Sequence, residues 1–173
     1  EESVDAAGSG EVLSGKCGDN LTWTLEDEVL TISGTGDMYT YEGGAGKEYS
    51  KAPWRYLYFT SLVIGAEITS IGNNAFYGCS WLETVEMSDV KNIGDNAFFK
   101  CGMKTIDLSN VETIGKRAFE SCSFDTIDIP RVKEIGGVAF HGCRNLKTIE
   151  LPEIELIEDN MFCGCENLNE VKI

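Results

Sequence analysis

The chain of 173 residues is 42% hydrophobic and 25% charged, which is ordinary for a globular protein and excludes disorder of the whole chain. Its formal net charge of −15 disfavours nucleic acid and anionic membrane surfaces as partners, because both would repel it. No apolar run is long enough to cross a bilayer, so we expect no membrane insertion.

Residues 1–14 are small and acidic, and we predict that they form a flexible N-terminus. They lack the basic start and apolar core of a signal peptide. If the protein is secreted, we therefore expect that the signal peptide has already been removed.

Residues 15–58 are predicted to form an N-terminal cap. Within them, the β-rich runs Leu21–Leu25 and Val29–Ile32 flank a polar Glu-Asp-Glu turn, which is the pattern of a β-hairpin. Residues 33–50 are rich in glycine, serine and tyrosine and are predicted to be loop. The first unit of a repeat array needs a cover over its apolar end, and the cap would supply it.

From residue 59 to residue 173 the sequence repeats. Five cysteines recur at intervals of 22, 21, 21 and 22 residues, and other residues keep the same period. The aligned columns are Cys79, Cys101, Cys122, Cys143 and Cys165; Ile71, Ile93, Ile114, Ile135 and Ile157; Phe76, Phe98, Phe119, Phe140 and Phe162; and Ala75, Ala97, Ala118, Ala139 and Met161. Such a period is typical of a leucine-rich-repeat solenoid, in which each unit buries its apolar edge against the next.

Each unit has two halves. The segments V-E-M, I-D-L, I-D-I and I-E-L alternate apolar and acidic residues, as a half-buried strand does. The other half places Ile71, Ala75, Phe76 and Cys79 at a spacing that fits one face of a short helix. We therefore predict an α/β leucine-rich-repeat right-handed solenoid of about five to six repeats, with a parallel β-sheet on the concave face and short helices on the convex side.

The repeated motif I-G-x-x-A-F-x-x-C-x-x-L-x-x-V/I, as in Ile71 to Cys79 and beyond, resembles that of the BspA-like leucine-rich-repeat family. The resemblance covers residues 59–173. Members of this family are surface or secreted proteins of bacteria and of some protists. The resemblance therefore implies an extracellular or cell-surface location and a role in adhesion or protein binding, and it brings no catalytic motif.

An acidic column beside a threonine column is the candidate ligand-binding face. Neighbouring parallel strands lie ~4.8 Å apart, so these side chains should form ladders along the solenoid. They are Thr84, Glu86, Thr105, Asp107, Thr126, Asp128, Thr148 and Glu150. One interpretation is a solvated polar face, and the other is a site for a cation or a basic protein surface. A linear ladder supplies too few oxygens for calcium, so we expect no metal and no cofactor.

The cysteines and the single histidine are the remaining candidates for chemistry. The cysteine column is predicted to be a row of small buried thiols rather than disulfides or a zinc site. His141 and Cys163 occupy one column and are predicted to be neighbours, which is the minimum for a nucleophile pair. No orienting acid or oxyanion pocket is evident beside them, so the sequence predicts no enzyme and no catalytic residues.

These observations favour a monomeric binding module whose concave face contacts an extracellular or host protein with a basic surface. Trp81, at a variable position, is predicted to be an exposed contact residue. Two alternatives stay open at this point. The chain could be a spacer or stalk that presents another domain, or, more remotely, a hydrolase that uses Cys163 and His141.

Overall fold

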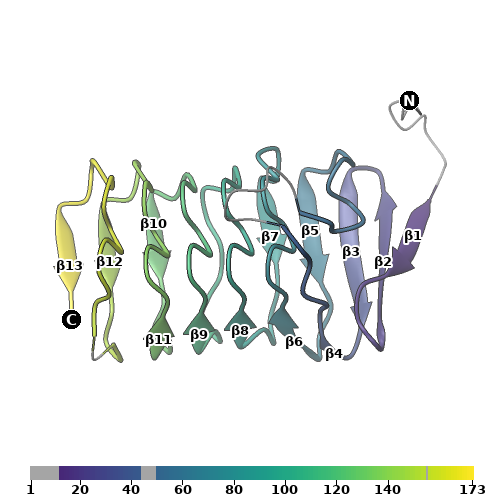
Figure 1. The fold of residues 1–173 in the computed structure, drawn as a ribbon, viewed down its shortest axis with the longest axis horizontal. Coiled ribbons are helices and arrows are strands. Elements are labelled where there is room, and N and C mark those ends of the chain that lie inside the picture. Colours follow the sequence, from purple (N-terminus) through teal and green to yellow (C-terminus); the bar gives the residue numbers. More distant parts are fainter. Residues whose placement is uncertain (1–11, 44–49, 155) are drawn as a thin grey trace.

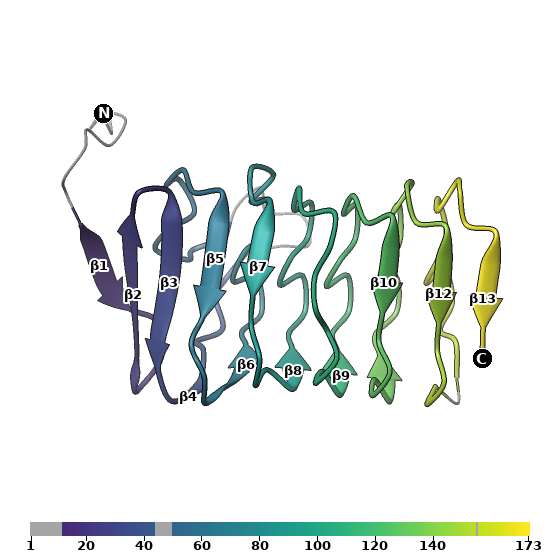
Figure 2. The ribbon, with the colours of Figure 1, turned by 180° about the vertical axis from the view of Figure 1, so that it is seen from behind.

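The protein is a solenoid of stacked coils, seen in a computed structural model that describes residues 12–43, 50–154 and 156–173. Figures 1 and 2 show the coils following one another along the long axis, with the N-terminal strands at one end and the C-terminal strand at the other. Within the described residues every regular element is a β-strand. The strands are β1 (Leu13–Lys16), β2 (Leu21–Glu26), β3 (Val29–Gly34), β4 (Gly36–Asp37), β5 (Ser61–Ile64), β6 (Ile68–Ile71), β7 (Thr84–Glu86), β8 (Asn92–Ile93), β9 (Thr113–Ile114), β10 (Thr126–Asp128), β11 (Glu134–Ile135), β12 (Thr148–Glu150) and β13 (Glu170–Lys172).

Two layers of strands run along the solenoid. One layer holds the sheets β1-β2-β3-β5-β7 and β10-β12-β13, and its outward surface is called the strand face below. The other layer, the second sheet, has the order β11-β9-β8-β6-β4. Every pair outside the β1-β2-β3 meander is parallel, as crossover connections between successive coils require. The prediction of a parallel-strand solenoid is therefore confirmed.

The N-terminal strands continue the sheet of the repeats. β2 and β3 pair as an antiparallel hairpin, and Asp27 and Glu28 between them have φ angles of 47° and 64°. Positive φ at both loop residues is the geometry of a type I′ hairpin turn. β3 then pairs parallel with β5, so no gap separates the hairpin from the first coil. Of the segment predicted to be flexible, residues 1–11 lie outside the described residues, while Leu13 and Ser14 belong to β1.

The predicted short helices are wrong, because the segment after each strand of the second sheet makes its hydrogen bonds to the next coil. The amides of Asn74, Phe76 and Gly78 donate to the carbonyls of Asp95, Ala97 and Phe99, at 2.7–2.9 Å. Alternate amides thus point along the solenoid, which a helix cannot do. The chain achieves this with a residue in the left-handed region in every coil, as its φ angles show. These residues are Asn74, Asn96, Arg117, Val138 and Asn160.

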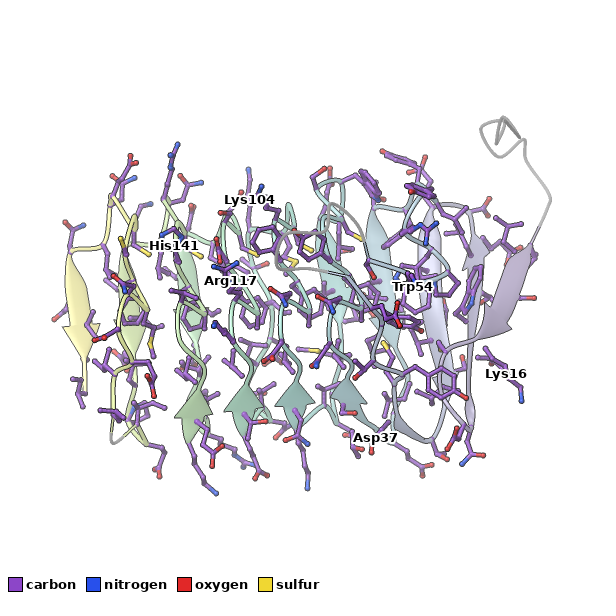
Figure 3. The ribbon with its side chains drawn as sticks, in the orientation of Figure 1. Lys16, Asp37, Trp54, Lys104, Arg117 and His141 are labelled. Carbon is purple, nitrogen blue, oxygen red and sulfur yellow. The ribbon has the colours of Figure 1, made fainter. Side chains whose placement is uncertain are left out.

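The phenylalanine column forms a stack of rings through the core. Successive rings from Phe76 to Phe162 have centroids 5.2–6.0 Å apart and lie within 15° of parallel. Trp54 begins the stack, with its ring 5.4 Å from that of Phe76, and its indole N–H donates to the carbonyl of Ala75 at 2.8 Å. Figure 3 shows Trp54 at this place near the N-terminal end. Each ring pair adds about 0.5–1.5 kcal/mol to the stability that burial provides.

The cysteine column is a second ladder, and the prediction of small buried thiols is confirmed for Cys79, Cys101, Cys122 and Cys143. From Cys101 onward, each thiol of the column donates to the carbonyl of a phenylalanine. The pairs are Cys101 to Phe76, Cys122 to Phe98, Cys143 to Phe119 and Cys165 to Phe140, at 3.0–3.1 Å. Burial raises the pKa of Cys79 and of Cys143 to about 12. These groups are therefore held as protonated thiols.

Two parts of the predicted pattern are absent. The segment I-D-L at residues 106–108, expected to be a strand, forms no strand, and the strand face is divided there into two sheets. Ile157, predicted to join the buried isoleucine column, is 39% exposed, and Leu156 beside it is 68% exposed. The coil that contains them does not continue the second sheet, which ends at β11.

The close spacing of the coils gives the first prediction. A Cβ atom on Gly115 would lie 2.6 Å from the backbone nitrogen of Asp95, whereas one on Gly137 would meet nothing within 4 Å. We expect Gly115→Ala to lower the free energy of unfolding by about 1–3 kcal/mol through overpacking. Gly137→Ala is the matched control and should change it by less than about 0.5 kcal/mol. Urea unfolding measures both, and equal effects would contradict the packing argument.

The thiol ladder predicts a loss of stability in alkali. The pKa of Cys122 is raised well above 9.0 by burial, so the thiol keeps its proton in the folded state when the unfolded chain has lost it. Stability therefore falls as the pH rises above about 9, by up to about 1.4 kcal/mol per pH unit for each such thiol. Cys122→Ala should unfold with a shallower alkaline slope than the wild type in reducing urea titrations. Cys163→Ala is the exposed-thiol control, and an unchanged slope in Cys122→Ala would be evidence against this account.

Candidate functional site

The strand face carries the predicted polar rows where its strands are paired. Thr126 lies opposite Thr148, and Asp128 lies opposite Glu150, on neighbouring parallel strands β10 and β12. On the other side of the gap, Thr84 and Glu86 of β7 lie opposite Ser61 and Val63 of β5. Thr105 and Asp107 are exposed but belong to the unpaired segment between the two sheets. Apart from half-buried Thr148, all eight predicted side chains are exposed.

The four acids of the column are not equivalent. The carboxylate of Asp107 accepts a hydrogen bond from the amide of Ser109 at 2.9 Å, and this bond lowers the pKa of Asp107. The carboxylate of Glu150 accepts one from Lys172, at 2.5 Å. Glu86 and Asp128 are exposed and form no ion pair or hydrogen bond with another described side chain. Glu86 and Asp128 are therefore the two acids of the column that have no partner among the described residues.

The face extends further toward the N-terminus than the sequence analysis proposed. Thr24, Thr31 and Val63 lie side by side on β2, β3 and β5, in the row that continues to Glu86. In the adjacent row the hydroxyl of Thr84 donates to that of Ser61 at 3.0 Å. The face thus has a hydroxyl-rich half and an acidic half. The alternation of β2, with Leu21, Trp23 and Leu25 buried, could have indicated the outward threonines.

Aromatic side chains lie just before two strands of this face. Tyr58 is 59% exposed and precedes β5, and Trp81 precedes β7 in the next coil. Their ring centroids are 6.4 Å apart. Trp81, predicted to be exposed, is half-buried. Nearby, the guanidinium of Arg55 lies 4.5 Å from the ring centroid of Tyr56, so an aromatic face in this part of the chain already accepts a cation.

His141 lies beside a carboxylate that the sequence analysis did not pair with it. Its Nδ1 atom is 3.6 Å from Oε1 of Glu120, whose Oε2 atom is 3.4 Å from Nε of Arg117. Figure 3 shows Arg117 and His141 in neighbouring coils. The backbone places Cys163 in the coil after His141, because the amide of Gly142 donates to the carbonyl of Cys163 at 2.8 Å. Among the described residues, however, no hydrogen bond joins the thiol of Cys163 to His141, so the two side chains do not form a nucleophile–base pair.

Residues 12–43, 50–154 and 156–173 contain no cluster of three or more His, Cys, Asp or Glu side chains in a metal-binding arrangement. The same part of the chain contains no helix with the length and apolarity of a membrane span.

The comparisons with known proteins agree with this geometry. The family model described as "BspA type Leucine rich repeat region (6 copies)" matches residues 50–169. A leucine-rich repeat protein of T. pallidum is similar in structure, with a TM-score of 0.63 and 26% identity over 88% of this chain and 79% of that protein.

Two further solved structures share the fold. A leucine-rich repeat protein from Eubacterium ventriosum has a TM-score of 0.59 and 24% identity, and one from Bacteroides ovatus has a TM-score of 0.52 and 20% identity. These matches cover 84% and 96% of this chain but only 45% and 53% of those proteins, so the chain spans about half of their length. No curated protein matches the chain. The repeat matches and the parallel-strand coils together show that the chain belongs to the BspA-type leucine-rich-repeat family.

Proposed function

We propose that this chain is a protein-binding module of the cell surface or extracellular space, and that its strand face contacts a basic surface of a partner protein. A leucine-rich-repeat solenoid is a fold suited to protein interaction. The observation that carries the finer proposal is the pair of exposed carboxylates Glu86 and Asp128, one on each sheet of the strand face, which have no partner among the described side chains. Neither carboxylate is used to hold the fold together.

Electrostatics supports a cationic partner. The formal net charge of −15 attracts a basic protein over long distances, and the exposed acids then set its position on the face. The ion pair between Lys172 and Glu150 shows a cation bound at one acid of this column. Each exposed ion pair contributes only about 0.2–1 kcal/mol, so several contacts must act together.

The hydroxyl-rich half of the face supplies the remaining contact area. Threonine and serine hydroxyls can both donate and accept hydrogen bonds, which suits a protein surface of mixed polarity. Tyr58 and Trp81 at the edge of this half provide aromatic area of the kind that is enriched at interfaces. The sequence resemblance to a family of surface proteins supports the proposed adhesion role and extracellular location.

Charge reversal tests the strand face. The double variant Glu86→Lys with Asp128→Lys should weaken binding to immobilised extracellular host proteins about tenfold, because it replaces two attractions by two repulsions. Glu67→Lys with Asp159→Lys is the matched control, since it changes two exposed acids away from the strand face by the same charge. Binding is measured by surface plasmon resonance at low and physiological salt.

The control variant should bind within about twofold of the wild type. If both double variants lose the same affinity, net charge rather than the strand face determines binding. If the strand-face variant binds as the wild type does, the face is not the contact surface, and the spacer interpretation is favoured instead.

A further inference from the structure

The second sheet stops one coil before the end of the solenoid. In the three preceding coils, the amide of a glycine donates to the isoleucine carbonyl of the coil before it, at 2.7–2.9 Å; the pairs are Gly94 to Ile71, Gly115 to Ile93 and Gly136 to Ile114. The equivalent bond from Glu158 to Ile135 is not formed. The amides of Val138 and Phe140 likewise lack the bonds to the next coil that their counterparts make. The hydrogen bonds between coils resume at Cys163, whose carbonyl accepts one from the amide of Gly142.

The cause lies in the glycine column. A Cβ atom on Gly94, Gly115 or Gly136 would come within 2.4–2.7 Å of a backbone nitrogen in the preceding coil. Only glycine permits so close an approach. The next member of the column is Glu158, whose Cβ atom cannot fit at that distance. The final coil therefore stands away from β11 between residues 156 and 160, and among the described residues β11 is the edge strand of the second sheet.

A groove of about 760 Å³ lies over this part of the second sheet. Its lining extends across the second sheet, from Ile93 of β8 to Thr113 of β9 and Ile135 of β11. Glu153, Leu156 and Glu158 of the displaced coil also line it. The volume is within the range of sites that bind ligands, and Leu156 is a large apolar side chain that is 68% exposed there.

We propose that this groove binds an extended peptide segment of a partner protein, which adds as a strand to the free edge of β11. The free backbone groups of an edge strand are satisfied by another strand, and an extended peptide supplies them. Leu156 would contact an apolar residue of the peptide. Four acids and two lysines line the groove, so a peptide with a basic residue fits its charge. They are Asp95, Glu134, Glu153, Glu158, Lys116 and Lys133.

The groove is independent of the strand face, because it is built from the second sheet. Its peptide must approach the backbone of β11 as closely as β11 approaches β9, where Gly136 is needed. The peptide should therefore carry an apolar residue followed by glycine, as β11 itself does in Ile135-Gly136. Selectivity for glycine at that position distinguishes strand addition from a general attraction to a basic peptide.

The test uses a fluorescein-labelled peptide with the sequence of residues 131–138, Arg-Val-Lys-Glu-Ile-Gly-Gly-Val. We expect saturable binding to the full chain by fluorescence anisotropy. The same peptide with Gly136→Glu should bind at least tenfold more weakly, because its side chain blocks the close approach. No saturable binding by the first peptide, or equal binding by both, overturns the proposal.

Two variants of the protein test the groove itself. Glu158→Gly lets the last coil close onto β11 and should reduce peptide binding at least tenfold, with an unchanged β-sheet circular dichroism spectrum. Glu158→Ala removes the same charge but keeps a Cβ atom, so it should lose only the contribution of one exposed charge, about threefold in affinity.

Other results of the same experiment contradict the groove. If Glu158→Gly binds like the wild type, the space beside β11 is not the site. If Glu158→Ala loses as much affinity as Glu158→Gly, the carboxylate rather than the open edge holds the peptide. If Glu86→Lys with Asp128→Lys abolishes peptide binding, the peptide occupies the strand face.

Discussion

The backbone hydrogen bonds between successive coils set the spacing on which the rest of this structure depends. Parallel strands lie ~4.8 Å apart, and the same interval is imposed on every side chain that occupies one column. Side chains that stack well at this distance therefore recur. Phenylalanine rings form a continuous stack from Trp54 to Phe162, cysteine thiols reach the carbonyls of the phenylalanine column, and glycine occurs where two backbones come closest. The repeat in the sequence follows from this one geometric constraint.

The same spacing organises the surface. Identical outward positions on neighbouring strands become rows, so a single threonine and a single acid in each repeat produce an extended polar face. The rows do not remain uniform, because local partners modify them. Lys172 neutralises Glu150 and the amide of Ser109 holds Asp107, while Glu86 and Asp128 keep unpaired charges. A partner protein that binds this face would therefore contact an uneven distribution of charge rather than a uniform acidic row. Hydroxyl-rich and aromatic surface lies beside the charged positions.

Departures from the repeat have local structural consequences. Glu158 in place of glycine coincides with the end of the second sheet, the loss of three inter-coil hydrogen bonds and a groove beside β11. The ring stack spans the break, although its last interval, between Phe140 and Phe162, is 6.0 Å and the longest of the phenylalanine pairs. The thiol of Cys165 still reaches the carbonyl of Phe140. The core thus holds the last coil in place while its second-sheet half is displaced, which is how a rigid solenoid can contain an open edge.

The sequence by itself determined the period, the columns that form the core, the parallel strands and the outward row of threonines and acids. Each of these features recurs in every repeat, so aligning the repeats with one another identifies the equivalent positions. The sequence could not decide between a helix and an extended turn for the segment from Ile71 to Cys79, since both bury the same residues, and only the inter-coil bonds of Asn74, Phe76 and Gly78 select the turn. Nor could it foresee that Trp54 heads the ring stack, that Glu120 lies beside His141, or which acids are unpaired. Those outcomes depend on distances between coils, and such distances exist only after the chain has folded.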